Sequence, residues 1–233
     1  ALDPQLRVWV TLDQDSVLRQ ARECEAQAIA GGVLGQLHGL PIGIKDIFHT
    51  KGLKTTGCSP LFADFVSDSD ATAVARLREA GAIIMGKTVT TELAFTDPPP
   101  TLNPWDYSRT PGGSSSGSAV GVAASIFPAA LGSQTAGSVL RPASYNGVVG
   151  MKPTFGRISR HGVFAVAESL DTMGFFVRSV EDAAIVLGEL DTLYTAATVQ
   201  AEDATAIVEA RNTVIALVSE EDSVLERLRA QVR

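Results

Sequence analysis

Two kinds of apolar pattern alternate along this chain. In the first, apolar or small side chains recur at the spacing of one helix face, about every 3.6 residues. In the second, apolar residues follow one another without a break, as in a strand buried on both faces. The first kind predicts helices at residues 13–31, 70–80, 116–127 and 180–190, and a helical turn at 140–147. The second kind predicts strands at residues 39–48, 82–86 and 128–135, with further core sequence at 147–159.

This alternation predicts the fold class. Helices that alternate with buried strands belong to an α/β protein with helices on both faces of the sheet. We therefore expect a layered α/β/α sandwich around a mixed, largely parallel β-sheet. A strand at residues 213–218 and a helix at 220–233 continue the pattern. The proline-rich stretch 97–111 interrupts it, because proline cannot donate to a strand ladder.

Local signals place some of the predicted helix ends. Asp70 is the N-cap candidate of the helix at 70–80, and Gly81 follows its last residue. The helix at 13–31 likewise begins with acids and stops at glycine. These signals indicate that the helices are separate elements joined by short turns.

Composition and charge mainly exclude certain classes of protein and partner. Hydrophobic residues make up 45% of the 233 residues and charged residues 19%, which indicates an ordinary globular core. The net charge of −7 repels a phosphate backbone, so nucleic acid is not an expected partner. No apolar run approaches the roughly 20 residues of a membrane span, and no signal peptide is visible. Cys24 and Cys58 have no metal-binding spacing, so we expect free thiols in a cytoplasmic protein.

One motif suggests nucleotide binding but does not fit its surroundings. Residues 81–88 (GAIIMGKT) match the phosphate-loop pattern GxxxxGK[ST]. In a phosphate loop a strand precedes the first glycine, and the four variable residues turn around phosphate. Here a predicted helix precedes Gly81, and the variable residues are apolar. The segment is therefore predicted to be a buried strand.

A second motif suggests an α/β-hydrolase. Residues 113–117 (GSSSG) match the nucleophile elbow GxSxG with Ser115 at its centre. The elbow needs a preceding strand and the order serine, acid, histidine. A proline-rich loop precedes it instead, and no Asp or Glu separates Ser115 from His161, the last histidine. A glycine-serine linker is also disfavoured, because the apolar run AVGVAASIF follows directly.

A serine nucleophile in this chain therefore needs a base other than histidine. Lysine can serve where burial favours its neutral form. Lys45 lies between apolar neighbours in residues 39–48. A lysine in such a strand more often extends its charged end to solvent, so the residues alone leave both interpretations open.

Three separated stretches resemble the amidase signature family. GLPIGIKD is similar to its lysine-bearing strand, and GGSSSGSAVGVAA followed by ALGSQTAGSVLRPASYNGVVGMKPTFGRISRHGV is similar to its signature. SLDTMGFFVRSVEDAA resembles the sequence after that signature. The likeness runs from about Gly35 to Leu190, and the three stretches follow one another in the family's order and spacing. The local pattern is most similar to malonamidase-like small-amide hydrolases. It implies the amidase signature fold.

The resemblance implies a Ser-Ser-Lys triad that hydrolyses amides without a cofactor or metal. The family's lysine falls on Lys45, its bridging serine on Ser114 and its nucleophile on Ser138. Neutral Lys45 would accept a proton from Ser114, which accepts one from Ser138 as Ser138 forms an acyl-enzyme. The oxyanion hole is expected to consist of the backbone amides of Thr135, Ala136, Gly137 and Ser138.

Further expectations concern the surroundings of the two serines. The resemblance implies a cis peptide bond between Gly113 and Ser114, and we expect Gly113, Ser115 and Arg141 to be substrate-binding residues. Arg141 would either bind a substrate carboxylate or form a structural salt bridge beneath the site. The first alternative favours amides that carry an acid group.

Two positions depart from the family pattern. Gln134 stands where the family often has an acid, and Ala136 replaces a commoner glycine. Both changes keep the backbone donors of the turn. We interpret them as variation within the family rather than as loss of activity.

Family members are usually much longer than this chain. We therefore expect one amidase signature domain over residues 1–233, with its core at 35–190, that is a truncated form or the N-terminal half. The expected function is hydrolysis of a small amide to a carboxylate and ammonia or an amine. The alternatives are the A subunit of an aminoacyl-tRNA amidotransferase and a catalytically incomplete fragment that acts as a scaffold. Family analogy also suggests a homodimer.

Overall fold

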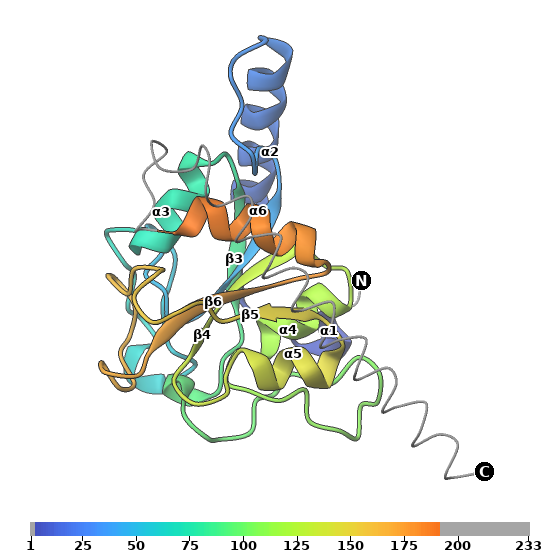
Figure 1. Ribbon diagram of the computed structural model, residues 1–233, viewed down its shortest axis with the longest axis vertical. Coiled ribbons are helices and arrows are strands. Elements are labelled where there is room, and N and C mark those ends of the chain that lie inside the picture. The colour runs from blue at the N-terminus through green and yellow to red at the C-terminus, as the bar shows by residue number, and fades with distance from the viewer. Residues whose placement is uncertain (1–2, 192–233) are drawn as a thin grey trace, which may run out of the picture. The chain divides into compact units, whose positions relative to one another are not determined.

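A mixed sheet of six strands forms the centre of residues 3–191, the part of the chain that this computed structural model describes (Figure 1). The strands are β1 (Trp9–Leu12), β2 (Pro41–Lys45), β3 (Ile83–Thr88), β4 (Ala129–Gln134), β5 (Val149–Met151) and β6 (Thr172–Val177). Their order across the sheet is β1-β3-β2-β4-β6-β5. The strand predicted at 213–218 and the helix predicted at 220–233 lie outside the described residues.

The central strands are parallel and the outer strands are antiparallel to their neighbours. β2 pairs in parallel with both β3 and β4. β1 joins β3, and β6 joins both β4 and β5, by antiparallel pairing. The predicted strands at 39–48, 82–86 and 128–135 correspond to β2, β3 and β4. The mixed sheet is thus confirmed, but it is largely parallel only at its centre, because β1, β6 and β5 join it by antiparallel pairing.

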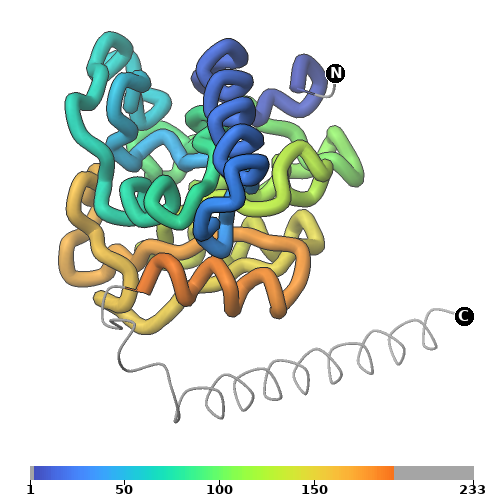
Figure 2. Tube along the Cα trace, turned by 90° about the horizontal axis from the view of Figure 1, so that it is seen from above, coloured from blue at the N-terminus to red at the C-terminus, as the bar shows by residue number. Residues whose placement is uncertain are grey.

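Helices cover both faces of this sheet, as the α/β/α prediction requires (Figures 1 and 2). They are α1 (Asp3–Leu6), α2 (Gln14–Ile29), α3 (Thr72–Glu79), α4 (Ser116–Ala123), α5 (Leu140–Asn146) and α6 (Val180–Leu190), with 3-10 turns at Pro60–Phe62 and Glu92–Ala94. α2 packs against β3 and extends beyond the sheet (Figure 1). No helix within residues 3–191 is both long and apolar enough to cross a membrane.

Each face of the sheet has its own apolar core. One core includes residues of α3 and α6, and the other includes residues of α4 and α5. Adjacent β4 residues Ala130 and Leu131 belong to different cores, and so do Phe175 and Phe176 of β6. This alternation is that of strands buried on both faces. It explains why their sequences are continuously apolar.

Two predicted helices differ in detail from the observed ones. Asp70 is not the N-cap of α3, because Ala71 holds that position and the Asp70 carboxylate instead accepts a hydrogen bond from Arg78 Nε at 2.9 Å. The helix expected at 116–127 ends earlier, since Ser125 has a left-handed backbone conformation with φ of +56°.

Two oppositely charged side chains are fully buried beside the ends of β2 and β3. Lys87 Nζ lies 2.6 Å from Phe48 O and 2.7 Å from Thr55 Oγ1. It also lies 3.4 Å from Asp46 Oδ1, and Asp46 is equally buried. Burial lowers the pKa of Lys87 to about 8, although Asp46 opposes this shift. The lysine of the phosphate-loop match thus belongs to a strand, as predicted, and is enclosed.

This pair generates a prediction about stability. Replacing Lys87 by Met should leave the Asp46 carboxylate buried without its cation, which typically lowers the free energy of unfolding by about 3–5 kcal/mol. Urea unfolding monitored by circular dichroism measures this difference. Lys51→Met is the matched control, because Lys51 is exposed, and it should change stability by no more than about 0.5 kcal/mol. Equal unfolding midpoints for the two variants would contradict the prediction.

Candidate active site

The carboxyl ends of the parallel strands meet at one edge of the sheet. Lys45 is the last residue of β2, and Gln134, the last residue of β4, leads into the turn that holds Ser138. The loop before α4 supplies Ser114. In open α/β sheets, ligands bind beyond the carboxyl ends of the strands. This edge is therefore the candidate active site.

Lys45 is fully buried and contacts two serine hydroxyls. Its Nζ lies 2.7 Å from Ser114 Oγ and 2.8 Å from Ser133 Oγ, and Ser133 O is 3.5 Å away. Within residues 3–191 the amine forms no ion pair. The alternative of a lysine that extends to solvent is therefore wrong, because the whole side chain is 0% exposed.

This environment changes the protonation of Lys45. Burial lowers the pKa of its amine from the ordinary value of 10.5 to about 7, because an ammonium ion loses its hydration there. Cys58 and Asp171 oppose the shift by a smaller amount. Near neutral pH, an unprotonated amine is thus available in contact with a hydroxyl that it can deprotonate.

Hydrogen bonds fix the loop that carries Ser114. The peptide bond between Gly113 and Ser114 is cis, at the place that the family resemblance implies. Ser114 O accepts hydrogen bonds from Ser116 N at 2.9 Å and from Thr91 N at 3.2 Å. Ser116 Oγ donates to Gly112 O at 2.8 Å. The backbone is thus held on both sides of the serine that contacts the lysine.

Arg141 and Ser115 connect this loop to its surroundings. Arg141 Nε and Nη2 donate to Gly113 O at 3.1 and 2.9 Å, and the arginine forms no salt bridge with any described residue. Ser115 N donates to Ser138 O at 3.3 Å. Ser115 Oγ bonds to both N and O of Ser133, each at 3.3 Å. Ser115 is fully buried, and its hydroxyl connects the loop to β4.

The turn 135–138 carries backbone amides that have no acceptor. Across the described residues, none of its four N–H groups donates a hydrogen bond, whereas the next two amides do. Gln134 Oε1 accepts from Val139 N at 3.0 Å and from Leu140 N at 2.9 Å. The glutamine that replaces the family's acid thus still provides an acceptor. Successive free amides of this kind can hold an anion.

Ser138 ends this turn with an uncommitted hydroxyl. The residue is 8% exposed, and its Oγ has no hydrogen-bond partner in the part of the chain that the structure describes. No existing bond therefore has to break before this oxygen approaches another group.

Two residues of this region were not among the predicted ones. Ser133, the second partner of Lys45, lies on β4, whose register with β2 pairs Ile44 with Leu131. That register brings a hydroxyl of one strand beside the lysine of the next, but strand pairing cannot be read from residue types alone. Asp171 accepts a hydrogen bond from Thr135 Oγ1 at 2.5 Å. It lies in the stretch SLDTMGFF, where nothing local marks it.

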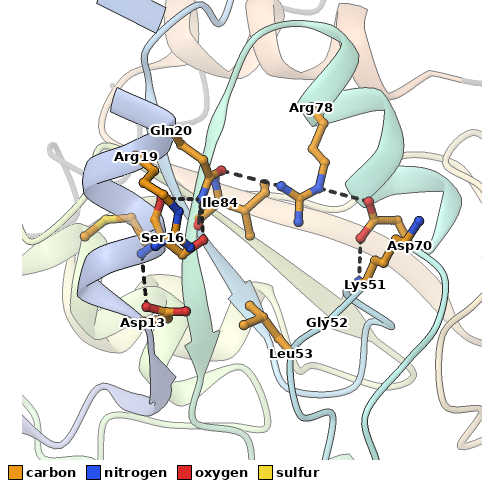
Figure 3. A pocket seen from close by; sticks show the side chains of 11 residues that line it. Asp13, Ser16, Arg19, Gln20, Lys51, Gly52, Leu53, Asp70, Arg78 and Ile84 are labelled. Atoms are coloured by element: carbon orange, nitrogen blue, oxygen red, sulfur yellow. Dashed lines mark hydrogen bonds and ion pairs between the residues drawn. The ribbon is translucent and has the colours of Figure 1, made fainter. Parts of the chain in front are cut away.

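A cavity of about 320 Å³ adjoins the turn through Asp171. Its lining is partly apolar and partly ionisable, and comprises Arg160, His161, Val163, Phe164, Ala165, Glu168, Asp171 and Met173. A larger cavity of about 480 Å³ lies between α2 and α3 (Figure 3). There Arg78 is held by Asp70 and by Gln20. Neither Lys45 nor a serine of the candidate site lines this larger cavity.

Solved structures with a similar fold include amidases. The peptide amidase from Stenotrophomonas maltophilia matches with a TM-score of 0.79 and 40% sequence identity, covering 84% of this chain and 43% of that one. The A subunit of glutamyl-tRNA(Gln) amidotransferase from Thermotoga maritima matches with a TM-score of 0.71 and 39% identity, covering 82% of this chain and 40% of that one. The Amidase family model matches residues 1–225, and the chain belongs to this family.

Curated relatives give the same family. The A subunit of glutamyl-tRNA(Gln) amidotransferase from Heliobacterium modesticaldum is 46% identical over 196 residues, and that of a Picosynechococcus species is 47% identical over 193 residues. These alignments cover 82% and 80% of this chain and 40% of each relative. The chain thus spans about two fifths of the length of these relatives. The family resemblance seen in the sequence is confirmed.

The low pKa of Lys45 predicts how stability depends on pH. Between about pH 7 and 10.5 the unfolded chain binds a proton at Lys45 that the folded chain does not, so the contribution of this residue to stability rises with pH. The difference in free energy of unfolding between the native chain and Lys45→Met should therefore increase over this range. Urea unfolding across a pH series measures it. Lys87 titrates in the same sense but is present in both proteins, so it cancels. A difference that stays constant with pH would show that Lys45 titrates normally.

Proposed function

We propose that this chain carries the nucleophile and proton relay of an enzyme that hydrolyses a carboxylic acid amide to a carboxylate and ammonia or an amine. The nucleophile is Ser138, the relay is Ser114 and the base is Lys45. One observation carries the proposal, namely the 2.7 Å contact between Lys45 Nζ and Ser114 Oγ in a fully buried setting. Membership of the Amidase family supports it.

The relay begins at the neutral amine. Lys45 takes the proton of Ser114 Oγ while Ser114 takes the proton of Ser138 Oγ, and Ser138 forms a bond to the amide carbonyl carbon. A pKa of about 7 supports this step, because an amine near its pKa can both accept and return a proton at neutral pH. The unpartnered Ser138 hydroxyl needs only to come within hydrogen-bond distance of Ser114.

Charge then develops on the carbonyl oxygen. The free amides of the turn 135–138 are the donors that support an oxyanion hole here. Because the turn is already formed, these donors need little reorganisation when the charge appears.

The reaction is completed by the same groups in reverse. The amide C–N bond breaks as the proton passes back through Ser114 to the leaving nitrogen, which departs as ammonia or an amine. Water then attacks the acyl-Ser138 ester and gives its proton to the relay. The acyl group leaves as a carboxylic acid, which ionises, and Ser138 regains its hydrogen.

Arg141 is our candidate for substrate selection. Its Nε and Nη2 are directed to Gly113 O, while Nη1 has no acceptor within residues 3–191 and the side chain is exposed. A guanidinium three residues after the nucleophile supports binding of a substrate that carries a carboxylate. Gly113 accepts the hydrogen bonds of this arginine and directly precedes Ser114. The proposal therefore places the Gly113 backbone beside the bound amide.

A panel of amides tests this proposal. The chain should release ammonia from small aliphatic amides, and Ser138→Ala should abolish the release, because removal of a nucleophile typically costs about 10⁶-fold in kcat. Acidic monoamides should be preferred over neutral ones, and Arg141→Gln should remove that preference. The enzyme-coupled assay of ammonia is the measurement, with circular dichroism to verify folding. Release that persists in Ser138→Ala would exclude Ser138 as the nucleophile, and no release from any amide by the folded chain would favour a scaffold.

A second candidate function follows from the relatives named as amidotransferase subunits. Their 46–47% identity supports a chain that works within a complex of several subunits and supplies ammonia to a tRNA-bound acyl group. In that case the affinity-tagged natural protein should elute with stoichiometric partner subunits, and its release of ammonia should depend on them. Light scattering of the eluted protein distinguishes this complex from a homodimer. Full amidase activity of the protein alone would exclude the second candidate.

A further inference from the structure

The Asp171 carboxylate connects the turn 135–138 of the candidate site to residues 166–167. Asp171 directly precedes β6, which pairs antiparallel with β4 so that Thr172 lies opposite Gln134. One step further along the same register brings Asp171 opposite Thr135, the first residue of the turn that ends in Ser138. The two side chains meet there, with Thr135 Oγ1 donating to Asp171 Oδ1 at 2.5 Å.

We propose that Asp171 is a positioning residue for amide hydrolysis, whose carboxylate fixes Thr135 and with it the turn 135–138. The proposal rests on the function proposed above. It assigns to Asp171 no contact with substrate. It states that the free amides of the turn and the nucleophile keep their working positions because Asp171 holds the first residue of the turn.

The Asp171 carboxylate is itself held by hydrogen bonds, as a residue that positions another must be. Its Oδ2 accepts hydrogen bonds from Val166 N at 2.8 Å and Ala167 N at 3.0 Å, and its backbone N donates to Ala167 O at 2.9 Å. Asp171 is 5% exposed. A buried carboxylate with donors on both oxygens has one stable orientation, so it acts as a fixed anchor for the Thr135 hydroxyl.

The turn itself forms few hydrogen bonds, although strand pairing holds Gln134 before it and Gln134 Oε1 accepts from the amides of Val139 and Leu140 after it. None of its four N–H groups bonds to a described residue. Its bonds at the far end are those of Ser138 O to Ser115 N and of Gly137 O to Arg141 N. The side-chain bond of Thr135 adds a contact within the turn itself, next to the paired strand residue Gln134.

The charge of Asp171 has a second consequence, for the base. It raises the pKa of Lys45 against the larger lowering by burial. Cys58 acts in the same direction, but burial raises the pKa of its thiol to about 12, so the thiol is uncharged near pH 7. Asp171 therefore opposes the lowering of the Lys45 pKa by burial near neutral pH.

Other ionisable groups near these residues are unchanged by the substitutions chosen below. Arg160, His161 and Glu168 share the 320 Å³ cavity with Asp171. Lys87 of β3 is paired with Asp46, which follows β2. A change in pH dependence on altering Asp171 alone therefore reports the loss of its own charge.

The first arm of the test changes the contact and keeps the charge. Thr135→Val has the same shape as threonine without the hydroxyl, and it should lower kcat by roughly 100-fold because the turn loses its orientation. The pH midpoint of kcat/KM should remain that of the wild type, because the charge of Asp171 is unchanged. Thr135→Ser, which restores a hydroxyl, should recover most of the activity.

The second arm removes the charge and keeps the contacts. In Asp171→Asn the amide oxygen can accept from Val166 N and Ala167 N, while the amide nitrogen can donate to Thr135 Oγ1. The rise of kcat/KM with pH should then move to lower pH, because a neutral neighbour no longer stabilises the ammonium form of Lys45. A residue that merely supports the fold would lower the melting temperature and leave the midpoint unchanged.

The outcomes separate this inference from the proposed function. If the wild-type chain shows no amide hydrolysis that depends on Ser138, the proposed function fails. If it does, and Thr135→Val keeps the wild-type kcat while Asp171→Asn keeps the wild-type pH midpoint, only the role of Asp171 fails. A titration of Lys45 by ¹³C NMR of labelled lysine needs no substrate. An identical midpoint in the wild type and Asp171→Asn would overturn the charge effect on Lys45 even in an inactive chain, whereas a wild-type kcat in Thr135→Val would overturn the positioning role.

Discussion

The structure of this site depends on one interaction that costs free energy, the burial of the Lys45 amine at the end of β2. An ammonium ion without water or a carboxylate beside it is strongly disfavoured, and Lys45 has only serine oxygens within contact distance among the described residues. The fold accommodates it by favouring the neutral amine, with a pKa of about 7. A neutral amine that touches a hydroxyl is a base ready for use, which is why the proposed chemistry needs no histidine.

The sheet brings these groups together through its topology. Because β2, β3 and β4 are parallel, their carboxyl ends coincide, and residues far apart in the chain share one edge. The loop before α4 then brings Ser114 to Lys45, and the turn after β4 carries Ser138. Both segments are tied to each other through Ser115 N and Ser138 O. The strands thus fix the backbone positions of the relay residues. Their side chains therefore need little conformational change to reach one another.

Much of this arrangement can be predicted from the sequence, and the failures have physical reasons. The buried strands are evident as continuous apolar runs, and β3 is recognisable although it matches a phosphate-loop pattern, because its variable residues are apolar. α1 and β1 escape prediction because four residues cannot display a period. β6 is missed although TMGFFV is wholly buried, since Thr172 and Gly174 interrupt its apolar run. Ser133 and Asp171 depend on strand register, which a single sequence does not specify.

The two buried lysines show why position decides the role of a residue type. Lys45 and Lys87 are both 0% exposed and both lie near the ends of parallel strands. Lys87 faces a carboxylate, and its pKa is about 8, whereas Lys45 faces hydroxyls, and its pKa is about 7. A carboxylate neighbour favours the ammonium form, so Lys87 serves as one half of a structural ion pair. A hydroxyl accepts a hydrogen bond from an ammonium and donates one to an amine. Lys45 can therefore exchange a proton with Ser114, whereas loss of the proton from Lys87 would leave the buried Asp46 carboxylate without its cation.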